Sequence, residues 1–485
     1  MFFKQIFEPK LAVYTYLIGC QRTGEAIVVD PMRDIQRYLD LAKANGLRIT
    51  AVTDTHIHAD YLSGARQLAN DHGVKVYASD EGDEDWKFEW LLDSNYAYQL
   101  IRDGDRFTVG NIEFLVTHTP GHTPEHVSFA VTDRGGGARE PMGVLTGDFV
   151  FVGDVGRPDL LETAAGQVGA MEPSARTLGA ELQKFKNLPA HWQVWPAHGA
   201  GSACGKSLGA VPVSTIGYEL ANNPALAKCD NIDGFVEYIL TGQPEPPLYF
   251  ARMKRDNRRG PALLSALPEP SEISAEEISA LIIDKSHAIL DTRSWEAYSA
   301  GHLPGSLFAP LNSQFNTVAG CYVTEDQRLY LICEKSRVDE AVVDLIRIGL
   351  DNIVGWISPE ALESYRAGGG ELRAAPEVDT ASLRVRLDAD EVIVIDVRRA
   401  AEIEETGGIP GALNIAHTRL LERLAEIPTD KEIVLSCHTG ARSAFAAGLL
   451  ASRGFRVSRH GAGFVGWRES GAPVSRNAGN AVEKS

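Results

Sequence analysis

The sequence lacks three features that would each have indicated a particular class of protein. No apolar run approaches the roughly 18 residues that a membrane-spanning helix needs, so we expect no transmembrane segment and no membrane partner. The six cysteines form no C-x-x-C pair, which argues against a disulfide framework or a structural zinc site, and we expect a reducing cytoplasm. The 47 basic residues are outnumbered by 65 acidic ones, and the net charge of −18 argues against a nucleic acid as partner.

The length of 485 residues is enough for about three domains at roughly 150 residues each. The N-terminus has no basic leader ahead of a long apolar block, so we expect a strand of the mature protein and no signal peptide. Short strands and helices alternate over residues 1–250, including a hairpin that turns at Gly110. Residues 251–275 are rich in proline and charge, which indicates a linker or a tail packed over a neighbouring domain.

An internal repeat of roughly a hundred residues follows and predicts two related domains, 276–372 and 380–475. The apolar segment 288–293 recurs at 392–398, and 329–333 recurs at 433–437. Each copy continues into an apolar-periodic helix, and strands that alternate with helices at this spacing predict an α/β domain with a parallel sheet.

The richest stretch of potential ligands is T-H-I-H-A-D-Y-L-S-G at residues 55–64. His56, His58 and Asp60 follow a short buried strand at alternate positions, which point the same way along an extended chain. Imidazole and carboxylate groups are ligands of zinc and of non-haem iron. A polar loop whose histidines satisfy backbone groups is the alternative interpretation.

Further residues of the same types follow other apolar runs and count against that alternative. His122 lies in T-P-G-H-T-P-E-H, Asp148 in L-T-G-D, and His198 in W-P-A-H-G. Each occupies a glycine- or proline-containing turn, and loops on a rigid scaffold commonly carry function. Together with the first stretch, these motifs resemble the five-motif pattern of the metallo-β-lactamase fold.

Tyr61 departs from that pattern, because the two-metal members of the family carry a histidine at this position. Its replacement weakens a second metal site formed by Asp60, position 61 and His198. The remaining His56, His122 and Asp148 are two histidines and a carboxylate, the set that non-haem Fe(II) oxygenases use.

The last copy carries C-H-T-G-A-R-S at residues 437–443, between an apolar run and a helix. Backbone N–H groups and a helix N-terminus around Cys437 would stabilise a thiolate, and Arg442 adds positive charge. A buried structural cysteine is the alternative. With D-V-R at 396–398 and I-P-G-A at 409–412, this copy resembles the rhodanese family, although Gly408 stands where the family often has histidine.

The middle copy retains the rhodanese-like scaffold, but its loop reads C-E-K-S-R-V. Cys333 aligns with Cys437, whereas the loop glycine is absent and Val338 stands at the position of Arg442. Glu334 places an anion beside the sulfur, which raises a thiol pKa. We interpret this copy as an inactive rhodanese.

Nearly the whole chain is similar to fused persulfide dioxygenase–rhodanese proteins of bacterial sulfide detoxification. That resemblance implies a metallo-β-lactamase αββα sandwich followed by two rhodanese-like α/β domains with parallel sheets. It also implies one Fe(II) per chain, held by His56, His122 and Asp148, with ligand-orienting residues His58, Asp60, Tyr61 and His198. The implied substrates are a low-molecular-weight thiol persulfide and O2, and the implied rhodanese chemistry interconverts sulfite and thiosulfate at Cys437 with Arg442.

Three residues near these motifs are candidate substrate contacts: Arg157, Asp159 and Cys204. For Arg157 and Asp159, a structural ion pair is an equal alternative. For Cys204, the equal alternative is a small buried cysteine that only fills space in the core. Cys20 is expected to be a small buried cysteine.

Two rival functions remain open at this stage. One is a two-zinc thioester hydrolase of the glyoxalase II type, and the other is a non-catalytic sulfur carrier or sensor that uses Cys437 alone. We expect a homo-oligomer; the sequence names neither the thiol nor the direction of sulfur flow.

Overall fold

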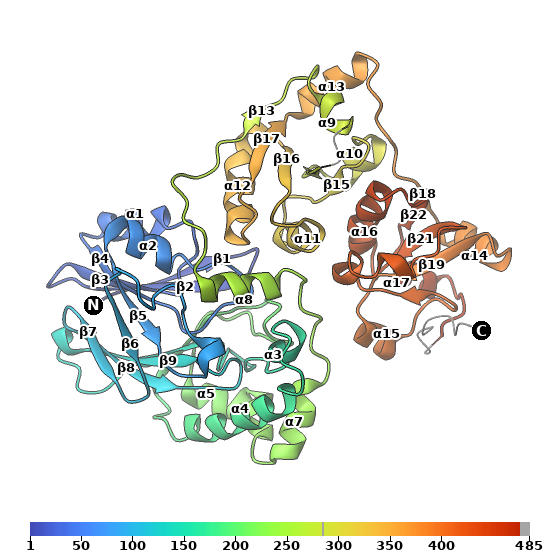
Figure 1. Cartoon of the computed structure of the whole chain (residues 1–485). Coiled ribbons are helices and arrows are strands. Elements are labelled where there is room, and N and C mark those ends of the chain that lie inside the picture. The colour runs from blue at the N-terminus through green and yellow to red at the C-terminus, as the bar shows by residue number, and fades with distance from the viewer. Residues whose placement is uncertain (284–285, 476–485) are drawn as a thin grey trace. The chain divides into compact units, whose positions relative to one another are not determined.

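Two six-stranded sheets form the centre of the N-terminal part of the computed structural model, which describes residues 1–283 and 286–475 (Figure 1). In spatial order the first sheet contains β1 (Phe2–Glu8), β2 (Val13–Cys20), β3 (Glu25–Val29), β4 (Arg48–Thr53), β5 (Lys75–Ser79) and β6 (Tyr98–Ile101). The second contains β12 (Ser214–Thr215), β11 (Gln193–Pro196), β10 (Gly143–Gly147), β9 (Val127–Asp133), β8 (Ile112–His118) and β7 (Arg106–Val109). The predicted hairpin is β7–β8, with Gly110 at φ 55° in its turn.

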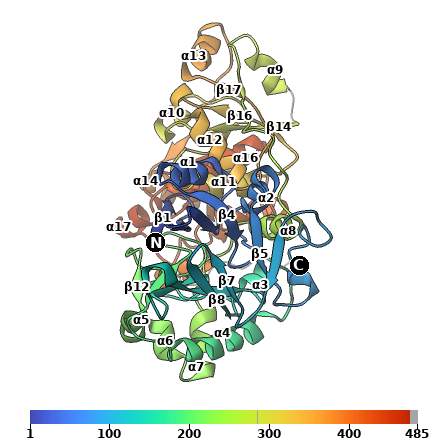
Figure 2. The same ribbon diagram turned by 90° about the vertical axis from the view of Figure 1, so that its left-hand side faces the viewer.

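Helices cover the outer face of each sheet (Figure 2). The first sheet packs against α1 (Gln36–Ala44) and α2 (Ala65–His72), and the second against α4 (Met171–Phe185), α5 (Ile216–Asn222), α6 (Pro224–Lys228) and α7 (Ile232–Leu240). Three apolar clusters therefore fill this unit, one between the sheets and one beneath each helical layer. Because both faces of each sheet are covered, central strands such as β2 are buried along their whole length.

The N-terminal unit extends beyond the expected domain end at residue 250. It comprises Met1–Ser265 with the short stretch Ile346–Gly349. Residues that the sequence assigned to a linker begin inside α8 (Phe250–Arg259), which buries Phe250, Met253 and Asn257 along one face. A short helix, α3 (Leu160–Thr163), follows the Asp148 loop.

The second unit contains two five-stranded parallel sheets with the same strand order. The middle copy has the order β13 (Ser271–Glu272), β17 (Ile353–Ile357), β16 (Arg328–Ile332), β14 (His287–Asp291) and β15 (Leu307–Phe308). The last copy has the order β18 (Glu377–Val378), β22 (Val457–His460), β21 (Glu432–Ser436), β19 (Val392–Asp396) and β20 (Leu413–Asn414). The sequence repeat is therefore a repeat of the fold.

Helices flank both of these sheets. The middle copy carries α9 (Ile278–Ile283), α10 (Trp295–Ala300), α11 (Phe315–Tyr322), α12 (Val338–Arg347) and α13 (Pro359–Ala367). The last copy carries α14 (Thr380–Asp388), α15 (Ala400–Thr406), α16 (Ala441–Ser452) and α17 (Gly463–Glu469). None of the helices in the described ranges combines the length and apolar character that crossing a membrane requires.

One ion pair recurs at the same place in both copies. Asp291, the last residue of β14, accepts from Arg293 at 2.6 Å, and Arg293 also donates to a backbone carbonyl of residue 301 at 2.9 Å. Asp396 and Arg398 repeat both contacts at 2.6 Å and 2.9 Å. Each guanidinium thus ties the end of a central strand to the turn that follows the next helix.

Candidate functional site

The histidine loop connects β4 to α2 in the N-terminal unit. His56 and His58 lie there with ring centroids 4.2 Å apart, and both are buried. His122 lies in the turn between β8 and β9, and Asp148 follows β10 directly. Three loops that are distant in sequence therefore meet at one edge of the two-sheet sandwich.

The residues predicted as metal ligands come together in this place. Ligand atoms of His56, His122 and Asp148 all lie within 4.8 Å of one another. The Asp148 Oδ2 atom is 3.4 Å from His122 Nε2 and 4.0 Å from His56 Nε2. All three side chains are buried, so water competes poorly for the position between them.

A second cluster of potential ligands lies next to Asp148. Ligand atoms of Asp60, His198 and Cys204 also lie within 4.8 Å of one another. His198 Nε2 is 3.3 Å from Asp148 Oδ1 and 3.6 Å from Asp60 Oδ2. Burial, reinforced by the Asp60 and Asp148 carboxylates, raises the pKa of the Cys204 thiol well above its ordinary value.

The chemistry of these groups fits a bound cation. Neither oxygen of Asp148 accepts a hydrogen bond of normal geometry from the described residues, and Asp60 Oδ2 and His198 Nε2 are likewise without partners there. A buried carboxylate without a donor is costly, whereas a metal ion between the clusters would satisfy it. The pKa of Asp148 is raised well above its ordinary value, chiefly by burial.

The histidines are in the protonation state that metals require. Burial lowers the pKa of His56 well below its ordinary value, and it lowers the pKa of His122 to about 4 and that of His198 to about 3. All three imidazoles are therefore neutral near pH 7 and can each present a lone pair to a cation.

His58 belongs to a different group of contacts. Its Nε2 atom is 3.1 Å from Asp30 Oδ1 and 3.0 Å from the Tyr61 hydroxyl. Burial alone would lower the pKa of His58, but the Asp30 carboxylate raises it to about 9. His58 is thus held in an ion pair with Asp30. The Tyr61 hydroxyl lies beside this pair and donates to the Asp30 carbonyl at 3.2 Å.

Sequence reasoning missed three residues that hold the ligand loops. Asp30 accepts from the Thr55 amide at 2.7 Å, and Glu125 accepts from the Ile57 amide at 2.7 Å. The third, His126, accepts from the Asp148 amide at 3.0 Å through Nε2. A signal existed for each, because Asp30 ends a buried strand and the other two belong to the His122 motif, but residue type alone did not reveal these roles.

Asn257 of α8 holds the histidine loop in place through side-chain hydrogen bonds to its backbone. Its amide donates to the carbonyls of His58 and Tyr61 at 2.8 Å and 2.7 Å, and its carbonyl oxygen accepts from the Ser63 amide at 2.8 Å. The side chain is buried. No local sequence pattern points to this residue, which lies nearly two hundred positions after the loop that it holds.

Arg157 and Asp159 form a buried ion pair, with Arg157 Nη2 2.6 Å from Asp159 Oδ2. The Arg157 carbonyl accepts from His122 Nδ1 at 3.0 Å, and the guanidinium donates to the carbonyl of Ala203 at 2.8 Å. The pair therefore connects His122 to the segment that carries Cys204. The ion pair, one of the two alternatives left open by the sequence, is present in the structure.

Cys437 lies between β21 and α16 in the last copy. The Gly440 amide donates to its Sγ atom at 3.2 Å, and the Ser443 hydroxyl is 3.7 Å away. Gly440 has φ 97°, and a Cβ atom there would lie 2.5 Å from the Gly461 carbonyl oxygen, so the loop requires glycine. Arg442 is held by Glu402 through two contacts of 2.5 Å and 2.8 Å.

The loop of the middle copy has a different shape. Residues Lys335–Arg337 form a single turn of 3-10 helix, and Arg337 pairs with Glu340 at 2.9 Å. Burial is the main cause that raises the pKa of the Cys333 thiol, and Glu340 and Glu334 add to it. The effect expected from Glu334 is therefore present but is a minor one.

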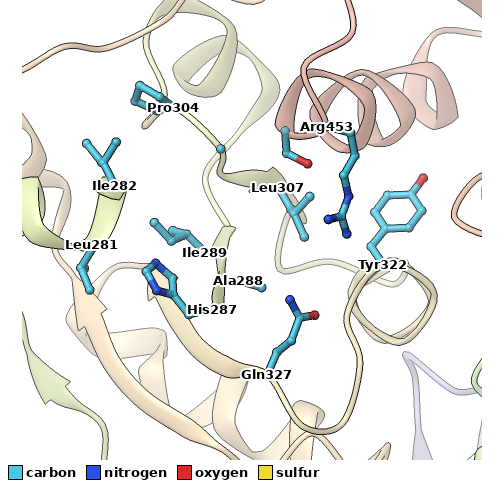
Figure 3. A pocket seen from close by; sticks show the side chains of 12 residues that line it. Leu281, Ile282, His287, Ala288, Ile289, Pro304, Leu307, Tyr322, Gln327 and Arg453 are labelled. Atoms are coloured by element: carbon cyan, nitrogen blue, oxygen red, sulfur yellow. The ribbon is translucent and has the colours of Figure 1, made fainter. Parts of the chain in front are cut away.

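A hollow of about 120 Å³ lies in the second unit, with residues from both copies around it (Figure 3). His287 and Tyr322 come from the middle copy, and the Arg453 guanidinium reaches in from the last copy. Of the described residues that line it, none is Cys333 or Cys437. The hollow is thus separate from the Cys437 loop.

Comparison with known proteins agrees with this architecture. The metallo-beta-lactamase superfamily model matches residues 9–198, and the rhodanese-like domain model matches residues 274–358 and 379–470. The crystal structure of a metallo-beta-lactamase from Staphylococcus aureus subsp. aureus COL is 39% identical and covers 74% of this chain and 98% of its own, with a TM-score of 0.66. The chain belongs to the metallo-beta-lactamase superfamily. The predicted fold class, including the rhodanese-like domains that follow, is confirmed.

Two curated relatives of this superfamily member bear on its chemistry. Persulfide dioxygenase ETHE1, mitochondrial, from Bos taurus is 29% identical over 247 residues, which are 50% of this chain and 83% of the relative. Cytoplasmic hydroxyacylglutathione hydrolase from Arabidopsis thaliana is 36% identical over 148 residues, 30% of this chain and 51% of the relative. The first relationship, with the rhodanese-like domains, supports an enzyme of sulfur metabolism.

The contacts of Asn257 generate a test of how the histidine loop is held. Replacement by alanine leaves three buried backbone groups without partners, so Asn257→Ala should destabilise the N-terminal unit by about 2–4 kcal/mol. It should also lower the amount of metal that copurifies with the protein. Urea unfolding and elemental analysis measure the two effects.

Asn222→Ala is the matched control, because the Asn222 amide donates only to the Tyr218 carbonyl at an exposed site. If both variants kept wild-type stability and metal content, α8 would have no part in holding the loop.

Proposed function

We propose that this protein oxidises a low-molecular-weight thiol persulfide with O2 at one Fe(II) and transfers sulfane sulfur at Cys437. In the balanced reaction, persulfide, O2 and one water give thiol, sulfite and two protons. Both atoms of O2 go to the outer sulfur, which loses four electrons to them. The observation that carries the proposal is the buried set of two neutral histidines and Asp148, whose oxygens accept no hydrogen bond of normal geometry from the described residues.

His56, His122 and Asp148 would hold the Fe(II). Bound Fe(II) would supply the one-electron and O2 chemistry that side chains lack. The protein orients the ligands through their other atoms: the Arg157 carbonyl can only accept, so His122 Nδ1 carries the proton and leaves Nε2 free. Thr55 plays the same part for His56, because its hydroxyl donates to Asp30 and accepts from His56 Nδ1 at 3.0 Å.

The second cluster would lie beside the persulfide. Asp60, His198 and Cys204 are adjacent to the Asp148 Oδ1 side of the site, and the raised pKa of Cys204 keeps its thiol protonated. A protonated thiol is a weak donor, and it can contact a persulfide sulfur without competing for the metal. We propose Cys204 as a substrate contact on this basis, with Arg157 and Asp159 holding its segment in place.

Sulfur transfer at Cys437 follows from the loop around its sulfur. The thiolate attacks the sulfane sulfur of a donor, the donor's S–S bond breaks, and the leaving thiol or sulfite takes the electron pair. Attack by sulfite on the resulting persulfide gives thiosulfate and restores the thiolate. The Gly440 amide and the N-terminus of α16 support the anionic sulfur at each stage, and the steps run in either direction.

One observation favours a second candidate, a two-zinc thioester hydrolase. Asp60, His198 and Cys204 form a possible second metal site, and Asp148 lies between it and the first. Against it, Tyr61 supplies no ligand, since its hydroxyl is directed to His58 and the Asp30 carbonyl. The raised pKa of Cys204 also disfavours the thiolate that zinc prefers.

Metal content distinguishes these two functions. The purified protein should hold about one iron per chain, and His122→Ala should lose the iron and lower persulfide-dependent oxygen uptake by roughly 100-fold or more, because a ligand is missing. Elemental analysis and an oxygen electrode provide the measurements. His191→Ala is the control, since His191 is an exposed histidine of the same unit. Two zincs per chain together with thioester hydrolysis would overturn the iron assignment.

The two active sites should be separable, because Cys437 and the metal ligands belong to different units. Cys437→Ser should lower thiosulfate sulfurtransfer by roughly three orders of magnitude or more, since a hydroxyl is a poor nucleophile at neutral pH. Oxygen uptake should remain largely intact while the product shifts from thiosulfate towards sulfite. Loss of oxygen uptake as complete as in His122→Ala would mean that Cys437 delivers sulfur directly to the metal.

Cys333 provides the matched control within the same chain. Cys333→Ser should change neither sulfurtransfer nor oxygen uptake, because the middle loop has Ser336 at the position of Gly440 and Val338 at the position of Arg442. After persulfide treatment, mass spectrometry should find an added mass of about 32 Da, one sulfur, on Cys437 and not on Cys333. A stable adduct on Cys333, with loss of turnover in its serine variant, would make the middle copy an active one.

A further inference from the structure

A cavity of about 390 Å³ lies on the far side of the second sheet from the first, beneath the C-terminal part of α4. Outward-facing side chains of β8, β9 and β10 form its floor, in which aliphatic and hydroxyl-bearing side chains alternate, and Phe185 and Trp192 form an aromatic wall. The volume is in the range of ligand-binding pockets in proteins. None of the proposed metal ligands is among the described residues that line it.

The floor of this cavity is continuous with the loop that carries Asp148. Thr146 and Phe149 line the cavity and flank Asp148 in sequence. The Thr146 hydroxyl donates to the Val150 carbonyl at 2.6 Å, which closes the loop on itself. A molecule in the cavity would therefore contact the loop on both sides of Asp148.

A chain of hydrogen bonds also connects the two places. The Asp148 amide donates to His126 Nε2 at 3.0 Å, so the other ring nitrogen of the neutral imidazole carries the proton. That Nδ1–H donates to the Thr119 hydroxyl at 2.8 Å, and the Thr119 and Ser128 hydroxyls are 2.9 Å apart. Thr119 and Ser128 both line the cavity.

The direction of these bonds leaves a donor available to the cavity. Thr119 and Ser128 have two hydroxyl hydrogens, one bond between them uses one hydrogen, and the other has no partner in the part of the chain that the structure describes. The indole N–H of Trp192, a buried side chain, also lacks a partner within residues 1–283 and 286–475. A buried donor without an acceptor costs about 1–3 kcal/mol, so an acceptor on a ligand would be favoured here.

The rim of the cavity is acidic. Glu81, Asp103 and Glu181 line it, and Lys184, which also lines it, is paired with Glu181 at 2.8 Å. An acidic rim disfavours anions. Sulfite and thiosulfate, the anions of the proposed reaction, are therefore poor candidates for this place.

We propose that this cavity is a second binding site, which takes an uncharged and mostly apolar ring compound that carries a carbonyl or ether acceptor. Its occupant acts on the loop of Asp148 through Thr146, Phe149 and the hydrogen-bonded chain that ends at His126. The binding site stands independently of the proposed persulfide chemistry; only the consequence for a metal at Asp148 rests on that function.

Three probes of one shape test the site on the full-length, metal-loaded protein. 2-Acetylnaphthalene offers a ring and an acceptor, 2-ethylnaphthalene lacks the acceptor, and 2-naphthoate is anionic. Isothermal titration should find binding of the first, binding about fivefold or more weaker for the second, which lacks one hydrogen bond, and none measurable for the third. Equal binding of all three, or no binding of any, would overturn the proposal.

Two variants locate the binding. Ala130→Trp fills the floor and should abolish binding of 2-acetylnaphthalene. Thr119→Val combined with Ser128→Ala removes both hydroxyls, so no hydroxyl hydrogen is left for the ligand, and this double variant should weaken binding about fivefold. Thr132→Ala is the matched control, because Thr132 lies two residues beyond Ala130 on the same face of β9, is buried, and does not line the cavity among the described residues. Binding that survives Ala130→Trp would place the ligand elsewhere and overturn the site.

Hydrogen exchange at the Asp148 amide measures whether a ligand in the cavity affects the Asp148 loop, and it requires no measurement of activity. Bound 2-acetylnaphthalene should slow exchange in the peptide 144–150 several-fold. Thr119→Val, which interrupts the chain but keeps the shape of the side chain, should bind the probe and lose this protection. Unchanged exchange in the wild type would overturn the coupling. Because neither readout uses a persulfide, failure of the persulfide chemistry would leave these results unaffected.

Discussion

The carboxylate of Asp148 sets the conditions for the rest of the N-terminal unit. It is buried, neither of its oxygens accepts a normal hydrogen bond from the described residues, and it stands between two sets of potential ligands. A carboxylate in this state is stable as an anion only beside a cation. His56, His122 and His198, the histidines closest to it, are neutral, and the charged His58 is paired with Asp30. The cation therefore has to be bound from outside. The site is therefore organised around a charge that the chain itself does not provide.

The loops that carry the ligands are held through backbone groups from several directions. Asp30, Glu125 and Asn257 each hold the histidine loop by a backbone N–H or carbonyl, and His126 holds the amide of Asp148. Hydrogen bonds to the backbone fix a loop while leaving the ligand side chains free to face inward. The cost is a set of buried polar groups, and each of them has to be satisfied for the loop to keep its shape.

The sequence predicted the ligand set because each member follows an apolar strand and strand ends meet at one edge of the sandwich. Asn257 could not be found in this way, since it contacts the histidine loop across nearly two hundred residues. Its helix looked like a linker because six charged residues hide the narrow stripe of Phe250, Met253 and Asn257. The buried ion pair of Arg157 and Asp159 could not be established from the sequence, because burial is a property of the tertiary packing.

The ion pairs Asp291–Arg293 and Asp396–Arg398 hold the framework of each rhodanese-like copy together independently of its cysteine loop. Both copies keep this pair, the same strand order and the same turn contact, although only one has the glycine-containing loop around its cysteine. The framework therefore does not depend on the loop for its stability. A duplicated domain built in this way can lose or gain reactivity through a handful of substitutions at one strand end, while the framework of the domain is kept.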